Sequence, residues 1–442
     1  MERRLGVALV GAGFINNFHA KAWTAVREAE IVAICSRRLD RAKALAELCT
    51  SLGVGSPKCY TDVAETVRDK NVEAVWLGIP NDARVPVVKA ITEEVAQGKS
   101  NVRGIACDKP LAMDVKQAKE MISLAEKAEV LHGYLENQVF APSLVRGKET
   151  LWRFGSKSGR PFLARASEEH GGPHEPWFWQ PSRSGGGVLI DMMCHSLEAT
   201  RFLLLDPSDE KKEGIRVKDI SAQSANLKWT MPKYTKQLFE ATRGQVDLSK
   251  MNYPPEDFAK ALVTYESSSG EILMTENTVS WCFAGPGLRL SFELIGPEYY
   301  MNTNSLQTDL QVFLGRNLKP EAGEYLVEKQ AAEQGLMPML ADEAFSYGYE
   351  AEDRYMVKCF REGRLPVENW YDGLFVVQLM MACYLSAEKG TRVSFSPTDI
   401  ESYIPRPARN LTTSESKPRE RSEYHRKDRE RSSKLKSENA DP

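Results

Sequence analysis

The chain has 442 residues, with 58 Lys and Arg against 61 Asp and Glu and a formal net charge of −3. Its length predicts two domains with room for an extension, because one hydrophobic core rarely organises so many residues. The small net charge gives no case for binding nucleic acid or a membrane surface. The eight cysteines show no Cys-x-x-Cys pair and no metal-finger spacing, and no apolar run is long enough to span a bilayer or serve as a secretory signal. We therefore expect a soluble cytoplasmic protein with reduced thiols.

The first predicted element is a buried parallel strand at residues 5–10, an apolar run that turns into a helix at Gly11 and Gly13. Glycines at such a turn let the backbone approach a pyrophosphate, and the next helix presents free N–H groups and a positive dipole end. The dinucleotide-binding fingerprint has a third glycine where this chain has Asn16. The turn predicts dinucleotide binding, with an ordinary strand-to-helix turn as the alternative.

The second predicted strand, residues 31–35, ends where dinucleotide-binding folds place an acid that binds the ribose of NAD. This chain has Ser36, Arg37 and Arg38 there instead. A carboxylate would repel a 2′-phosphate, whereas hydroxyl and guanidinium groups accept it. The pattern favours NADP over NAD, and the alternative is that both arginines are solvated loop charges.

Further strands are predicted at residues 74–79, 104–107 and 131–134, with helical patterns between them. This alternation predicts a doubly wound parallel sheet over residues 1–136, whose ligands bind at the carboxyl ends of the strands. Lys109 follows such a strand end. A lysine there can donate hydrogen bonds to a substrate hydroxyl and stabilise charge that develops on its oxygen.

Residues 184–205 place an acid and a histidine in an otherwise apolar helical run. Asp191 and His195 are four positions apart, so they share one face of a helix. Histidine exchanges a proton near neutral pH, and a neighbouring carboxylate can fix its tautomer, which suits a general base or acid. The alternative is that both residues lie on the wetted side of an amphipathic helix.

After residue 140 the strand-helix alternation ends, and longer, partly alternating runs predict a largely antiparallel sheet with helices on one face. The predicted strands are residues 162–167, 215–228, 258–266, 272–281 and 288–295. The predicted fold class is α/β, with a parallel-sheet domain at 1–136 and an α+β domain with an open sheet at 137–404. The mixed-charge run at 405–442 predicts a disordered tail.

Histidines and tryptophans precede the helix that carries Asp191. Aromatic faces stack on a pyranose ring and imidazoles bind hydroxyl groups, while core packing is the alternative for the tryptophans. The candidate substrate contacts are Asn137, His170, His174, Trp177, Asp191 and His195. We expect no metal site at His170 and His174, because the Gly-Gly-Pro between them prevents helical presentation of the pair.

Three signatures occur in order: GAGFIN near the start, DKPLA at residues 108–112, and GGG-x3-D-x3-H in the predicted helix. Together they resemble the Gfo/Idh/MocA family of nicotinamide-dependent oxidoreductases, which act on sugars and cyclitols, over residues from about 5 to about 395. The resemblance implies a Rossmann domain and an α+β domain whose open sheet packs against another subunit. It also implies a homo-oligomer.

By this resemblance Lys109, Asp191 and His195 are catalytic, His195 takes the hydroxyl proton, Asp191 orients it, and the Lys109–Pro110 bond is cis. The chain departs from the family pattern at two positions. Asp108 stands where the family usually has Glu, and the histidine often found soon after Pro80 is replaced around Arg84. The predicted cofactor contacts are Gly11, Gly13, Phe14, Ile15, Ser36, Arg37, Arg38, Pro80, Asn81, Asp108 and Lys109.

The sequence therefore predicts an NADP- or NAD-dependent oxidoreductase that moves a hydride between the nicotinamide and a secondary alcohol or ketone of a sugar, a sugar derivative or a cyclitol. Three alternatives stay open: a relative that retains NAD and cleaves a glycosidic bond, a non-catalytic dinucleotide-binding regulator, and a bilin- or diol-type reductase. Retention of Lys109, Asp191 and His195 argues against the regulator.

Overall fold

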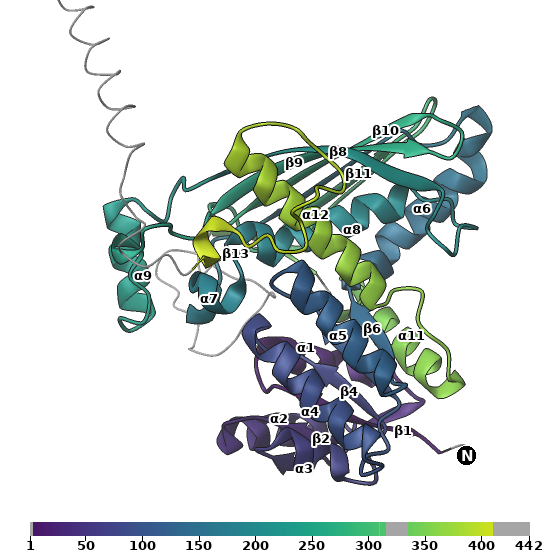
Figure 1. Cartoon of the computed structure of the whole chain (residues 1–442), viewed down its shortest axis with the longest axis vertical. Coiled ribbons are helices and arrows are strands. Elements are labelled where there is room, and N and C mark those ends of the chain that lie inside the picture. The colour runs from purple at the N-terminus through teal and green to yellow at the C-terminus, as the bar shows by residue number, and fades with distance from the viewer. Residues whose placement is uncertain (1–2, 309, 315–334, 341, 410–442) are drawn as a thin grey trace, which may run out of the picture. The chain divides into compact units, whose positions relative to one another are not determined.

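A six-stranded parallel sheet with helices on both faces forms the first part of the computed structural model (Figure 1). The structure describes residues 3–308, 310–314, 335–340 and 342–409, so the predicted tail lies outside it from residue 410 onward. The elements are β1 (Leu5–Val10), α1 (Phe14–Ala22), β2 (Ala29–Cys35), α2 (Leu39–Ser51), β3 (Lys58–Tyr60), α3 (Val63–Arg68), β4 (Ala74–Leu77), α4 (Arg84–Ala96), β5 (Gly104–Asp108), α5 (Val115–Lys127) and β6 (Leu131–Leu135). The predicted doubly wound sheet is confirmed.

The strand order in this sheet is β3-β2-β1-β4-β5-β6, and every pair is parallel. Every side chain of β1 and β4 is buried, because helices cover both faces, and this explains their unbroken apolar runs. Strands β2 and β3 lie on one side of β1, and β4, β5 and β6 lie on the other side, so the direction of winding reverses at β1. This reversal opens a crevice at the carboxyl ends of β1 and β4, where ligands bind in such folds.

The second sheet has seven strands in the order β12-β11-β7-β10-β9-β8-β15. Only its β7–β10 pair is parallel, so the prediction of a largely antiparallel sheet is confirmed. Its strands are β7 (Leu163–Glu169), β8 (Ile215–Ala225), β9 (Phe258–Ser267), β10 (Ile272–Ser280), β11 (Arg289–Ile295), β12 (Tyr300–Asn304) and β15 (Val393–Ser394). A separate two-stranded sheet pairs β13 (Leu310–Leu314) with β14 (Gly335–Met339).

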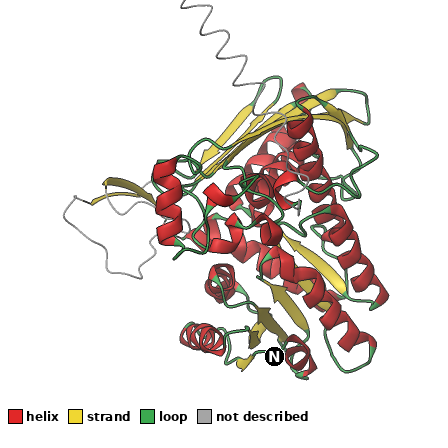
Figure 2. Cartoon of the chain, turned by 60° about the vertical axis from the view of Figure 1, so that its left-hand side comes forward, coloured by secondary structure: helices red, strands yellow, loops and turns green. Residues whose placement is uncertain are grey.

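Helices cover one face of the second sheet, as predicted, and α8 and α12 lie directly against it (Figures 1 and 2). The helices of this half are α6 (Pro142–Phe154), α7 (Pro181–Ser184), α8 (Val188–Leu204), α9 (Pro232–Ala241), α10 (Glu343–Ser346), α11 (Tyr349–Glu362) and α12 (Trp370–Lys389). The longest is α12, at 20 residues. Among the described residues, no helix combines the length and the apolar character needed to cross a membrane.

Helix α11 returns to the parallel sheet, where its side chains fill space that two glycines leave open. A Cβ added to Gly104 would lie 2.5 Å from the ring of Phe360, and one added to Gly133 would lie 2.6 Å from the sulfur of Met356. The indole N–H of Trp370, which begins α12, donates to the carbonyl of Gly133 at 2.9 Å. Helix α11 contacts β6 of the parallel sheet, and α12 contacts both β6 and strands β8 and β15 of the second sheet, so α12 joins the two sheets.

Candidate functional site

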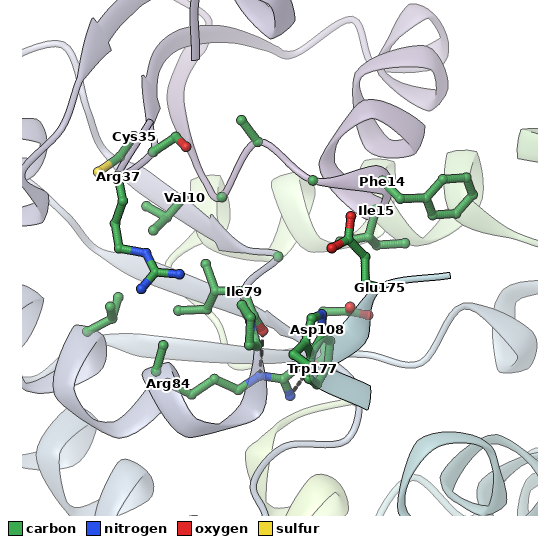
Figure 3. Close-up of a pocket in the computed structure, with 18 of the residues that line it drawn as sticks. Val10, Phe14, Ile15, Cys35, Arg37, Ile79, Arg84, Asp108, Glu175 and Trp177 are labelled. Atoms are coloured by element: carbon green, nitrogen blue, oxygen red, sulfur yellow. Dashed lines mark hydrogen bonds between the residues drawn. The ribbon is translucent and has the colours of Figure 1, made fainter. Parts of the chain in front are cut away.

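A cavity of about 430 Å³ lies along the carboxyl ends of β1, β2, β4 and β5 (Figure 3). This is large enough for a small-molecule ligand. Twelve of the predicted site residues line it: Gly11, Gly13, Phe14, Ile15, Ser36, Arg37, Arg38, Pro80, Asp108, Lys109, Trp177 and Asp191. The structure therefore brings every predicted cofactor contact except Asn81 into one cavity, together with Lys109 and Asp191 of the predicted catalytic set, whereas His195 does not line it.

The glycine turn after β1 fits a bound pyrophosphate. Gly11 has φ +103°, and a Cβ there would lie 2.2 Å from the carbonyl oxygen of Gly78, so only glycine is accommodated. A Cβ added to Gly13 would meet nothing within 4 Å, which leaves the backbone open toward the cavity. Gly13 is also the N-cap of α1 and provides no side-chain cap, so the first amides of the helix stay available for an anion.

Asn16 takes the place of the third fingerprint glycine and stabilises the same turn by other means. Its side-chain amide is fully buried and donates to the carbonyl oxygens of Val10 at 3.0 Å and Gly11 at 2.8 Å. A Cβ added to the neighbouring Gly78 would lie 2.7 Å from the side-chain oxygen Oδ1 of Asn16. The close approach that the missing glycine normally allows is therefore provided by Gly78, at the end of β4.

The far end of the cavity carries three arginines that follow β2. Arg38 is held by Asp40, with Nη2 2.5 Å from Oδ2 and Nε 3.2 Å from Oδ1. Arg41, which the sequence reasoning missed, lines the cavity one helical turn after Arg37. Neither Arg37 nor Arg41 forms an ion pair with a carboxylate in the part of the chain that the structure describes, so both can meet an anionic ligand.

Lys109 and Asp191 form an ion pair at the other end of the cavity. The Lys109 Nζ lies 3.3 Å from Asp191 Oδ1 and donates to the Asp191 carbonyl oxygen at 2.8 Å, while the indole N–H of Trp281 donates to Oδ2 at 3.2 Å. Burial lowers the pKa of the Lys109 ammonium, but the carboxylate of Asp191 more than offsets this, so the pKa is raised. Lys109 therefore stays cationic at neutral pH. The Lys109–Pro110 bond is cis, as the resemblance implies.

The helix that carries Asp191 is buried on nearly all sides. In α8 every residue except Phe202 is buried, and Asp191 and His195 are 6% and 4% exposed. The interpretation of these residues as the wetted side of an amphipathic helix is therefore wrong. Polar groups in such a position need partners, because a buried polar group without one costs about 1–3 kcal/mol.

The partner of His195 is Glu136, a residue that the sequence reasoning missed. A hydrogen bond 2.5 Å long joins His195 Nδ1 to Glu136 Oε1, and Glu136 is fully buried directly after β6. Burial raises the pKa of Glu136 well above its usual range. Glu136 thus holds the imidazole by Nδ1, while Asp191, the partner expected from the sequence, bonds to Lys109 and Trp281. The sequence signal that could have identified Glu136 was its position directly after a strand and before Asn137, which was itself a candidate.

Four other candidates have different surroundings. Asn81 and Asn137 are buried, and their side-chain amides donate to the carbonyl oxygens of Ser184 at 2.8 Å and Tyr347 at 2.7 Å. These amides hold the main chain, and neither residue lines the cavity. His170 is buried and its Nδ1 accepts from the amide of Gly172 at 3.0 Å, whereas His174 is exposed and also lies outside the cavity lining.

The two tryptophans before α8 differ in their surroundings. Trp177 lines the cavity and stacks on Phe178, with ring centroids 3.8 Å apart. Trp179 is buried and packs against Trp229 and Trp281 at centroid distances of 5.2 Å and 4.6 Å. Trp179 is therefore a core residue, which was the alternative interpretation of the tryptophans. Trp177 lines the cavity, so it remains a candidate ligand contact.

Two family models match successive parts of the chain. Residues 5–134 match the model of an oxidoreductase family with an NAD-binding Rossmann fold, and residues 156–298 match the Gfo/Idh/MocA C-terminal domain. The chain is 24% identical to D-apiose dehydrogenase of Paraburkholderia graminis over 90% of this chain and 92% of that protein. It is 25% identical to D-glucoside 3-dehydrogenase of Escherichia coli over 88% of this chain and 97% of that protein.

Among solved structures, GenD2 from gentamicin A biosynthesis in complex with NAD matches 90% of this chain and 98% of its own, with a TM-score of 0.70 and 25% identity. The open glycine turn and both members of the Lys109–Asp191 pair lie within the matched regions. The chain therefore belongs to the Gfo/Idh/MocA family of NAD-binding oxidoreductases.

Proposed function

We propose that the protein transfers a hydride between a nicotinamide cofactor and a secondary alcohol or ketone of a sugar, a sugar derivative or a cyclitol. One observation carries this proposal. A single cavity connects an open, uncapped glycine turn to the Lys109–Asp191 pair, and His195 follows Asp191 one helical turn later. The relatives named D-apiose dehydrogenase and D-glucoside 3-dehydrogenase support the substrate class.

Each polar group at the catalytic end has a distinct role in this proposal. Nicotinamide, when bound, supplies the acceptor or donor of the hydride. Lys109 keeps its proton and donates a hydrogen bond to the reacting oxygen, which stabilises negative charge there. His195 exchanges the hydroxyl proton at Nε2, because Glu136 engages Nδ1. Asp191 holds Lys109 in position rather than orienting the histidine.

We further propose that the cofactor is NADP in preference to NAD. The end of β2 offers no carboxylate to a ribose hydroxyl, and Ser36, Arg37 and Arg41 line the cavity there. A 2′-phosphate would accept charge-assisted hydrogen bonds from the two guanidinium groups. Arg38 contributes less in this account, because its guanidinium already binds Asp40 through two nitrogens.

A homo-oligomer through the second sheet is the proposed assembly. On the sheet face opposite the helices, Met274, Leu163, Ile295 and Tyr300 are register neighbours on β10, β7, β11 and β12. Met274 and Tyr300 are 39% and 54% exposed, so this apolar row reaches solvent in the isolated chain. A second copy covering the row would bury it. Light scattering on Tyr300→Glu should then show a smaller species than the wild type.

The test of the proposed reaction is the appearance of reduced nicotinamide when purified protein meets NADP or NAD and a panel of aldoses, glycosides and inositols. His195→Asn serves as the paired variant. Turnover that depends on His195 supports the proposal. If tight dinucleotide binding occurs without net reduction and a glycoside is cleaved, the retained-cofactor lyase is correct; binding without any chemistry identifies the regulator.

A further inference from the structure

Arg84, the first residue of α4, directs its side chain into the floor of the cavity, although it is only 2% exposed (Figure 3). All three hydrogen bonds of its guanidinium group go to main-chain carbonyl oxygens. Nε donates to Ile79 at 3.3 Å, Nη1 to Asp108 at 2.5 Å and Nη2 to Lys109 at 3.0 Å. The side chain therefore ties the end of β4 to the end of β5.

This arrangement is costly for a structural role alone. A cation at a helix N-terminus opposes the positive end of the helix dipole, and burial of a charge carries a desolvation penalty. Within the described residues no carboxylate forms an ion pair with Arg84, and the three hydrogen bonds of its guanidinium group named above go to carbonyl oxygens. A planar, rigid guanidinium is suited to fix several acceptors at once, which a lysine or a glutamine cannot reproduce.

The bonded carbonyls flank the residue that carries the catalytic ammonium group. The carbonyl before Lys109 and its own carbonyl both bind Arg84, and the Lys109 amide donates to Asp108 Oδ1 at 2.9 Å. All three main-chain polar groups around Lys109 are thus held. Because a lysine side chain is long and flexible, the position of its Nζ depends on a fixed main chain as well as on Asp191.

We propose that Arg84 is a positioning residue of the site, which sets the location of the Lys109 ammonium by clamping the main chain on both sides of Lys109. The expected effect on kcat rests on the proposed function, whereas the clamp itself rests on the hydrogen bonds of Arg84. A misplacement of about 1 Å can lower a rate by about a hundredfold, so loss of the clamp should act on kcat. Dinucleotide affinity should change little, because the phosphate contacts lie at the glycine turn and the arginines after β2.

The experiment compares Arg84→Ala and Arg84→Lys with Arg68→Ala. Arg68 also bonds through two guanidinium nitrogens, to Glu94 on α4, but lies outside the cavity, so it serves as a matched control. We expect Arg84→Ala to lower kcat by about a hundredfold and to keep the dinucleotide Kd within about threefold of the wild type. The kcat of Arg84→Lys should lie between those of the wild type and Arg84→Ala. Arg68→Ala should retain the wild-type kcat. Guanidinium chloride should restore Arg84→Ala in a saturable way that sodium chloride does not.

A second measurement follows Lys109 without turnover. Reductive methylation of the full-length protein, read by peptide mass spectrometry, should leave Lys109 unmodified in the wild type and in Arg68→Ala, because its ammonium is bound to Asp191. In Arg84→Ala Lys109 should become labelled, and guanidinium should protect it again. Protection of Lys109 in Arg84→Ala would overturn the inference, as would wild-type kcat in that variant. If the wild type turns over no substrate, the proposed function fails, and the methylation result still decides the clamp.

Discussion

The two ends of the cavity are built in different ways. At the proposed cofactor end, the lining residues between 36 and 41 come from one stretch of chain. The side chains of the Arg38–Asp40 ion pair there are each more than half exposed. At the proposed catalytic end, Lys109 after β5 and Asp191 on α8 line the cavity as an ion pair. His195 on α8 and Glu136 after β6 are buried, bond to each other and are not among the lining residues. An exposed charge can be exchanged with little effect on stability, whereas removal of a buried partner leaves an unpaired charge.

The largest expected effect tests the buried end. His195→Asn removes the proposed general base, so kcat should fall by about 10²–10⁴-fold while the dinucleotide still binds. Steady-state kinetics together with cofactor titration would measure both. His174→Ala is the control, because His174 is exposed and has no role in the proposed proton transfer. A His195→Asn enzyme within tenfold of the wild type would remove His195 from the chemistry.

The second effect tests whether the buried pair is coupled. Lys109→Met should lower kcat by about 10²–10³-fold and also lower the melting temperature, because Asp191 is left buried without its cation. The double variant Lys109→Met with Asp191→Asn should recover stability without recovering activity. Kinetics and thermal unfolding of Lys109→Met, Asp191→Asn and the double variant, compared with the wild type, form a double-mutant cycle. Additive losses of stability would show that the two side chains act independently.

The third effect belongs to the exposed end. Arg37→Ala and Arg41→Ala should each lower the preference for NADP over NAD by about tenfold or more, since a hydrogen bond to a charged group contributes about 1.5–3 kcal/mol. Thermal stability should be nearly unchanged in both. Arg38→Ala should have a smaller effect, because Asp40 already holds that guanidinium. Equal effects of the three substitutions on the ratio of kcat/KM values would contradict this assignment.

The smallest effect concerns Glu352, a buried carboxyl of α11 that does not line the cavity. It is fully buried, neither of its oxygens has a hydrogen-bond partner among the described residues, and burial raises its pKa well above the usual range. A raised pKa means that the folded state holds the proton more tightly than the unfolded state. The stability from Glu352 is thus present below the unfolded pKa and is lost as pH rises toward the folded pKa.

Glu352→Gln, which resembles the protonated acid, should therefore gain stability over the wild type as pH rises. The gain should be about 1.4 kcal/mol per pH unit across that window. Urea unfolding of both proteins at a series of pH values measures it. Parallel pH profiles would show that the carboxyl is ionised in the folded state.

The predictable parts of the fold and site depend on local patterns. The glycine turn, Arg37 and Arg38 after β2, and the Asp191–His195 spacing are each contiguous or one helical turn apart, so sequence alone located them. The strands of both sheets that carry long apolar or alternating runs were predicted to within a few residues. The short strands β3, β12 and β15 and the β13–β14 pair were missed, because they have five residues or fewer and lack an unbroken apolar run such as that of β4.

The missed site residues depend on contacts between distant segments. Glu136 meets His195 across 59 positions, and Trp281 meets Asp191 across 90. Arg84 was noticed only as a departure from the family histidine, and its carbonyl partners at Asp108 and Lys109 lie in the next strand of the sheet. Partners of this kind follow from the packing of strands and helices, which no local pattern specifies.

Isotope transfer tests the central claim most directly. Reduced NADP carrying deuterium at the transferable position is incubated with the protein and a panel of ketosugars and ketocyclitols, and the carbohydrate products are analysed by mass spectrometry. The account predicts that one deuterium appears on a product carbon with the wild type and not with His195→Asn. Tight cofactor binding with no deuterium in any product would contradict a hydride-transferring oxidoreductase and favour the retained-cofactor lyase or the regulator.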